Sequence, residues 1–136
     1  MPITNRDMVK AARERTFTAT FDIDNASTQS KALVSPDSDI RITGVSFVYS
    51  VATNTGTLAE NFQVGTAADG DMYFIGLAVI SQALGVIENK TLLSTALLPA
   101  GTALLVNKVT GTTGANTGEI TVVVRYEPVD PSAWVV

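Results

Sequence analysis

The stretch that decides the fold is Leu97–Glu127, LLPAGTALLVNKVTGTTGANTGEITVVVRYE. It contains two apolar segments, Ala103–Val109 and Glu119–Tyr126, whose β-branched residues favour strands. The residues between these segments are almost all Gly, Thr, Ala and Asn, which is typical of a loop. The stretch has no histidine, no cysteine and no cluster of acidic residues. It therefore predicts two strands of a β-sandwich that binds and assembles, and it argues against an enzyme.

The composition predicts a single domain whose surface is partly shared with neighbours. A chain of 136 residues falls within the size of one domain, and it can bury roughly two-thirds of the surface that its unfolded chain exposes. The hydrophobic content of 46% is ordinary, but charged residues make up only 16%, against a usual figure of about 25%. With so few charges, we expect other proteins to cover part of the surface. A small monomer rich in Thr and Ala is the alternative.

The charge balance and the missing residue types exclude several classes of chemistry. The net charge is −4, and the sequence has no basic stripe of the kind that phosphate backbones require, so we expect no direct nucleic-acid partner. The absence of cysteine rules out disulfides and thiolate chemistry, and the absence of histidine removes the commonest general base and metal ligand. No apolar run reaches the ~18 residues that span a bilayer, so we expect no membrane partner. The polar N-terminus lacks the features of a signal peptide, and we expect synthesis in a cytoplasm.

Period-two alternation predicts strands along the middle of the chain. It is cleanest in Thr16–Asp24, where Phe17 and Phe21 share one face. Gly44 interrupts the pattern of another segment, and a one-residue bulge there would return Val51 and the preceding apolar residues to the core. The further predicted strands are Lys31–Val34, Ile40–Val51, Asn61–Gly65, part of Met72–Leu84, and an edge strand at Thr91–Leu93. Six to eight strands separated by turn signals predict an all-β sandwich or barrel.

The two ends of the chain differ from this pattern. Residues 1–15 are polar and could form one short helix, and we interpret them as an N-terminal arm that becomes ordered when it docks. Residues 129–136 form a C-terminal tail with the only tryptophan, a residue type enriched at interface hot spots. This tail either folds back on its own sheet or docks on another subunit, and residues 16–128 form the sandwich. The candidate contacts with other subunits are Arg6, Met8, Arg13, Arg15, Trp134 and Val135.

Few side chains in the sequence suggest catalysis or metal binding. Three pairs of aspartates could supply carboxylate ligands to calcium, although aspartate also stabilises turns through backbone hydrogen bonds. These pairs are Asp22 with Asp24, Asp37 with Asp39, and Asp69 with Asp71. We interpret them as turn residues and solvated strand ends, and we predict no metal, no cofactor and no catalytic residue. No G-x-S-x-G or S-x-x-K motif is present, and the glycine-rich loop is not followed by a predicted helix that could bind phosphate.

Four motifs carry a resemblance to a known family. They are FQVGTA (Phe62–Ala67), DGDMY (Asp69–Tyr73), LPAGTALLV (Leu98–Val106) and TGTTGANTGEITVVVRYEP (Thr110–Pro128). In this order they resemble the small β-sandwich proteins of tailed-phage particles, which are the capsid decoration, or cement, proteins and their relatives in head fibres. The motifs span about half of the chain and consist of turns and strand ends. They contain no residue to which a family function can be assigned.

The resemblance implies a jelly-roll-like antiparallel β-sandwich, often a trimer, that sits between major capsid subunits. It implies a structural virion protein, made in the host cytoplasm and located on the capsid exterior. As a homotrimer bound to the major capsid protein, it would bridge several subunits and gain avidity, which stabilises the shell.

Two other function classes remain open at this point. A receptor- or carbohydrate-binding tip of a virion fibre would need exposed aromatic residues, for which Tyr49, Tyr73 and Trp134 are the candidates. A sandwich enzyme is the other class, and it is disfavoured by the lack of histidine, cysteine and any catalytic motif.

Overall fold

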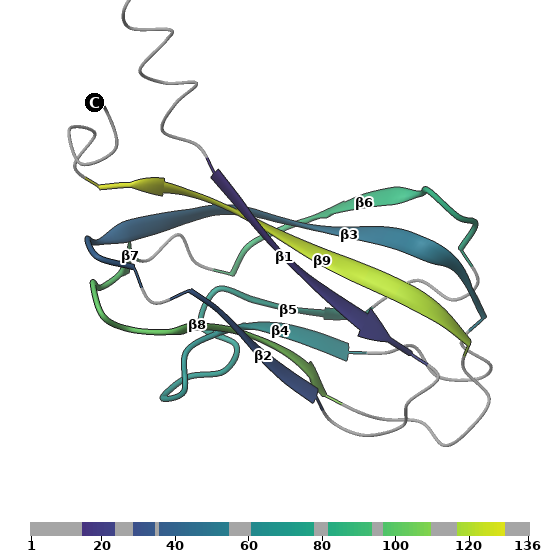
Figure 1. Ribbon diagram of the computed structural model, residues 1–136, viewed down its shortest axis with the longest axis horizontal. Helices are drawn as coiled ribbons and strands as arrows, with labels where there is room; N and C mark the ends of the chain where they lie inside the picture. The colour runs from purple at the N-terminus through teal and green to yellow at the C-terminus, as the bar shows by residue number, and fades with distance from the viewer. Residues whose placement is uncertain are drawn as a thin grey trace, which may run out of the picture.

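All regular structure among the described residues is β-strand. The computed structural model describes residues 15–23, 29–34, 36–54, 61–77, 82–93, 97–109 and 117–129. The strands are β1 (Arg15–Asp22), β2 (Gln29–Val34), β3 (Ile40–Asn54), β4 (Asn61–Gly65), β5 (Phe74–Leu77), β6 (Ile87–Lys90), β7 (Leu97–Leu98), β8 (Leu104–Val109) and β9 (Thr117–Pro128). They form two layers that face each other (Figure 1). The predicted all-β antiparallel sandwich is therefore confirmed.

The strand order is that of a jelly roll. Sheet A has the order β1-β9-β3-β6, with β7 also paired to β3, and sheet B has the order β2-β8-β4-β5. Every neighbouring pair is antiparallel. The chain passes repeatedly from one sheet to the other, as it does in the two interlocked Greek keys of a jelly roll. The first and last strands lie side by side, with Arg15 opposite Tyr126 and Asp22 opposite Glu119.

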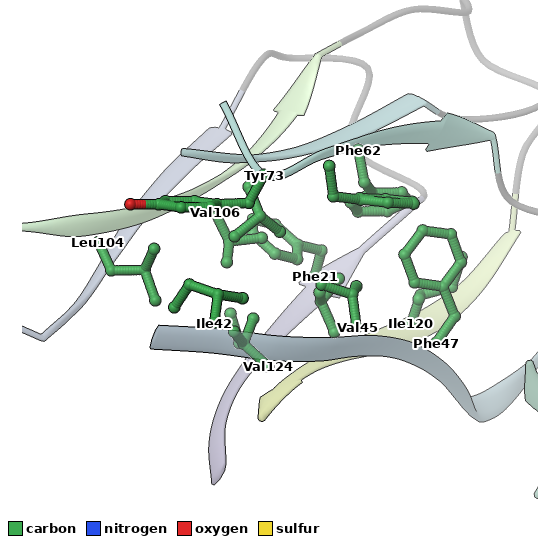
Figure 2. Close-up of a cluster of buried hydrophobic side chains, with 14 of the residues drawn as sticks. Phe21, Ile42, Val45, Phe47, Phe62, Tyr73, Leu104, Val106, Ile120 and Val124 are labelled. Carbon is green, nitrogen blue, oxygen red and sulfur yellow. The ribbon is translucent and has the colours of Figure 1, made fainter. Parts of the chain in front are cut away.

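The core lies between the two sheets, where alternate side chains of facing strands meet (Figure 2). Sheet A contributes Phe21 and Phe47, and sheet B contributes Phe62 and Phe74. The ring of Phe62 lies edge-on to both Phe21 and Phe47, with centroid distances of 5.5 and 5.1 Å. Phe47 also meets Phe74 at 5.6 Å. Such edge-to-face pairs contribute about 0.5–1.5 kcal/mol each beyond the burial of their area, so this aromatic cluster fastens the sheets together.

Two irregularities in β3 decide which of its side chains are buried. The register against β9 shifts between Ile42 and Gly44, which confirms the predicted bulge and keeps Tyr49 in the core. A second shift occurs between Tyr49 and Val51. Because one extra residue turns the following side chains to the other face of a sheet, Val51 is 48% exposed. The prediction that Val51 belongs to the core is wrong for this reason.

The strand predicted from the sequence after β5 is also in the wrong place. Thr91–Leu93 is not a strand, and β6 and β7 lie on either side of it. The residue Leu93 is instead fixed by one hydrogen bond, from its N–H to the carbonyl of Tyr73 at 2.8 Å. Within Met72–Leu84, the described strand is limited to β5. Short strands at a sheet edge have little periodicity of their own, which explains both differences.

Charged side chains on edge strands point toward the space between the sheets. On β6, Lys90 pairs with Glu88 and lies 4.9 Å over the ring of Phe47. On β2, Lys31 donates to the carbonyl of Thr20 in β1. Inward-pointing charges of this kind discourage edge strands from pairing with other chains. The β6 and β2 edges are thus poor places for a partner to add a strand, and the faces of the sheets are the further candidate surfaces.

Candidate functional site

The largest candidate interaction surface is the face of sheet A that points away from the core, called here the outer face of sheet A. Its centre consists of two rows of cross-strand neighbours from β1, β9, β3 and β6. One row is Thr20, Thr121, Val48 and Ile87, and the other is Thr18, Val123, Ser46 and Asn89. These side chains are uncharged, and several are β-branched, as expected for a pleated surface. The Thr20 and Thr121 hydroxyls lie 2.9 Å apart and share a hydrogen bond.

Charged residues lie at the two ends of this face. At one end, Asp22 of β1 neighbours Glu119 of β9. At the other end, Arg125 of β9 lies opposite Thr16 of β1, beside Gly44 of β3. Beyond this row Arg41 and Glu127 form an ion pair at 3.4 Å. The outer face of sheet A is therefore acidic at one end, neutral in the middle and basic at the other end.

The basic end is organised by a chain of hydrogen bonds across three strands. Arg125 Nη1 donates to Ser46 Oγ at 2.7 Å, and Ser46 Oγ donates to Asn89 Oδ1 at 2.7 Å. The glycine at position 44 permits this arrangement, because a Cβ there would lie 2.2 Å from Arg125 Nη2. The guanidinium consequently lies against the backbone of β3. Ser46, the middle member of this relay from Arg125 through Ser46 to Asn89, is 3% exposed, whereas Arg125 itself is half-buried.

The acidic end is held in a similar way. Ser50 Oγ donates to Glu119 Oε1 at 2.8 Å, and Thr121 Oγ1 donates to Ser50 Oγ at 3.2 Å. Both charged groups are thus positioned by hydroxyls of their neighbours before any partner arrives. Hydroxyls, one guanidinium and carboxylates in this arrangement are suited to non-covalent recognition of another protein surface.

Of the predicted subunit contacts, Arg15 is the residue that the structure describes. It is exposed at the start of β1, opposite Tyr126. Burial raises the pKa of Tyr126, and the positive charge of Arg15 opposes this effect. The remaining candidates lie outside the described residues; they are Arg6, Met8, Arg13, Trp134 and Val135. The contact role of the two ends therefore stays a prediction.

Four of the described aspartates of the three Asp pairs lie in connections between strands, whereas Asp22 is the last residue of β1. Asp39 Oδ1 accepts a hydrogen bond from the N–H of Ala100 at 2.9 Å, which ties two turns together. Asp69 and Asp71 lie close to each other in the β4–β5 connection, and a hydrogen bond from one carboxyl to the other raises the pKa of Asp71. Asp24 lies outside the described residues. Among the residues that are described, no group of three or more His, Cys, Asp or Glu side chains is arranged to hold a metal.

Two of the three aromatic residues considered for a carbohydrate-binding surface are among the described residues, and both are buried. Tyr49 and Tyr73 are both 0% exposed. The Tyr49 hydroxyl donates to Glu88 Oε1 at 3.1 Å, and the Tyr73 hydroxyl donates to the carbonyl of Leu97 at 3.0 Å. Burial raises the pKa of Tyr73. These two tyrosines therefore do not supply the exposed aromatic cluster that a carbohydrate-binding fibre tip would need; the third candidate, Trp134, lies outside the described residues.

Sequence reasoning missed two features of the structure. The alternation in β9 already indicated that Thr121, Val123 and Arg125 share a face, but not that Arg125 meets Ser46, 79 positions away. Only the register of β3 against β9 reveals that contact. The second feature is Lys108, which lies fully buried on β8 opposite Phe62. The alternation of buried residues along β8, which begins at Leu104 and Val106, places Lys108 on the same buried face.

Comparison with solved structures finds a protein of similar fold. No protein-family model matches the chain, and no curated protein matches it. A chain of the solved structure "Cyanophage Pam1 capsid asymmetric unit" is similar, with a TM-score of 0.54 and 16% sequence identity over 85% of this chain and 84% of that one. At this identity the similarity establishes the fold. Within the described ranges, no helix is long and apolar enough to cross a membrane.

Proposed function

We propose that this protein is a structural component of a phage virion that binds the capsid exterior and stabilises the shell by bridging major capsid subunits. The observation that carries the proposal is the fold that most of the chain shares with a chain from the Pam1 capsid asymmetric unit. The motifs that resemble phage decoration proteins, including Asp69–Tyr73 and Leu98–Val106, support the same role independently of that comparison.

The physical properties of the sandwich suit this role. A jelly roll offers broad sheet faces, and the outer face of sheet A is neutral over its two central rows. A surface with few charges loses little hydration free energy when a neighbour covers it. A protein that contacts several shell subunits at once gains avidity, and by binding only the assembled state it stabilises that state. This role requires no catalysis, no cofactor and no nucleic acid.

In this proposal the chain is made in the host cytoplasm and joins the particle as a homotrimer. Residues 16–128 form the body, and the arm of residues 1–15 and the tail of residues 129–136 reach the neighbouring shell subunits. The polar arm and the single tryptophan of the tail supply the contacts. The trimer and the contact arms rest on the sequence resemblance and on the composition of the two ends.

The test is binding to shells assembled from the major capsid protein alone. Purified protein should co-sediment with these shells in a saturable manner and raise the temperature at which they disrupt. Variants that lack residues 1–14 or 130–136 should keep the far-UV circular dichroism of the sandwich but bind more weakly. If both variants bound as tightly as the full chain, the contact arms would be wrongly assigned. No binding above that of an unrelated β-sandwich, with unchanged shell disruption, would refute the proposed function.

A further inference from the structure

The outer face of sheet A has a charge pattern that is complementary to itself. We propose that a second copy of this chain docks face to face on this surface, with its β9 antiparallel to the first β9. The contact would join two copies in solution, and on a particle it would join neighbouring copies or trimers. The inference goes beyond the proposed function and does not depend on it.

The pattern of β9 defines the symmetry of the contact. Its outward side chains include, in order, Glu119, Thr121, Val123 and Arg125. A two-fold axis that crosses the strands between Thr121 and Val123 exchanges these two residues, and it also exchanges Glu119 with Arg125. Each copy then presents its arginine to the glutamate of the other, which is the isologous pairing expected of a homodimer. The two charges of one copy lie about 20 Å apart along the strand, so each contact forms independently.

The middle of the face suits contact between two sheets. The two rows between the charged ends contain no charged residue. Ile87 is 65% exposed there, although it is a large apolar side chain. Covering such a side chain removes apolar surface from water and favours association. Stacked sheets pack about 10 Å apart, a distance that threonine and valine side chains fill.

The charged side chains at the two ends of the face are already held in position in the free protein. A guanidinium has five N–H donors, and among the described residues Arg125 uses Nη1 toward Ser46. The contact holds the planar group in place and leaves other donors for a carboxylate. Glu119 is held by Ser50 in the same manner. Because both groups are fixed in the free protein, little side-chain entropy is lost when they pair.

The size of the face and its charges favour a second copy in one orientation. Eight residues of each of β1, β9 and β3 and the four residues of β6, in strands about 4.8 Å apart, give a face of roughly 450 Å² per copy and about 900 Å² for the pair. This area lies at the lower limit of specific interfaces, so the contact should be weak and reversible. If the second copy had its β9 parallel to the first, Glu119 would meet Glu119, and like charges would oppose binding.

The experiment measures the mass of the purified full chain by sedimentation velocity over a range of concentrations. At low salt we expect the mass to double with rising concentration, and at 1 M salt, where the Debye length is about 3 Å, we expect the association to weaken. Arg125→Glu and Glu119→Lys should each abolish the doubling. The double variant restores the opposite charges in exchanged positions, so it should associate again.

Controls separate the contact from net charge and from misfolding. Asp37→Lys changes the net charge by the same amount as Glu119→Lys, but Asp37 lies in the turn between β2 and β3 and should leave the doubling intact. Circular dichroism and urea unfolding should show that each variant remains folded. The proposal is overturned if the wild type shows no concentration-dependent doubling at low salt, if either single variant still doubles, or if the folded double variant does not. Shell binding that persists in these variants would leave the proposed function standing.

Discussion

Replacing Phe62 with alanine should be among the most destabilising single changes in the sandwich. The side chain is 0% exposed and lies between the sheets, where its ring meets Phe21 and Phe47 edge-on (Figure 2). Phe→Ala substitutions in cores cost about 3–5 kcal/mol. The two ring contacts at 5.5 and 5.1 Å place this position in the upper part of that range, at about 4–5 kcal/mol. This is a large share of the ~5–15 kcal/mol that stabilises a typical domain.

The assay is urea unfolding followed by circular dichroism, with Phe17→Ala as the matched control. Phe17 is half-buried and stacks on Tyr126 at 4.7 Å, so we expect its loss to cost about 1–2 kcal/mol. For an m-value near 2 kcal/mol/M, Phe62→Ala should lower the unfolding midpoint by about 2 M. A cost below about 1.5 kcal/mol for Phe62→Ala, or one no greater than that of the control, would refute the central position of this ring.

Three further predictions concern pH, close packing and surface charge. Burial raises the pKa of Tyr73 above its ordinary value of 10.0, so the unfolded chain loses this proton first, and the stability present below about pH 10 is lost as the pH rises through the folded value. In urea titrations at several alkaline pH values, the free energy of unfolding of Tyr73→Phe should fall less with rising pH than that of the wild type. Gly65→Ala should cost about 3 kcal/mol because its Cβ would lie 2.2 Å from a backbone carbonyl. Gly44→Ala would instead displace the end of the Arg125 side chain from its hydrogen bond to Ser46, without moving backbone, and should cost about 1 kcal/mol; equal unfolding midpoints for the two variants would contradict this. Arg41→Gln and Glu127→Gln should each change stability by less than about 0.5 kcal/mol, because their ion pair is exposed, and a thermal shift beyond that limit would show a stronger contact.

The sequence was sufficient for the fold class and for the faces of the long strands. In β1, strict alternation identified the face that carries Phe21, because one face of the strand meets the core and the other meets solvent. Gly44 correctly indicated a bulge, since a strand interior tolerates glycine poorly without a special reason. The second register shift of β3, before Val51, had no such marker and was missed.

The candidate site could be predicted only in part. The common face of Thr121 and Arg125 follows from alternation within one strand, but the relay from Arg125 through Ser46 to Asn89 depends on how three strands are paired. Register between strands distant in sequence is set by the whole core and not by local pattern. The burial of Tyr49 follows from the bulge at Gly44, but the acceptor of its hydroxyl, Glu88, depends on how β3 pairs with β6.

The most direct test of the proposed role is quantitative mass spectrometry of virus particles purified from the source of this chain. The measurement is the number of copies of this protein for each copy of the major shell protein. A structural protein that bridges shell subunits should be abundant and present in a fixed ratio to the shell protein in every preparation. Absence from the particles, or a few copies in each particle, would contradict the proposed role on the shell.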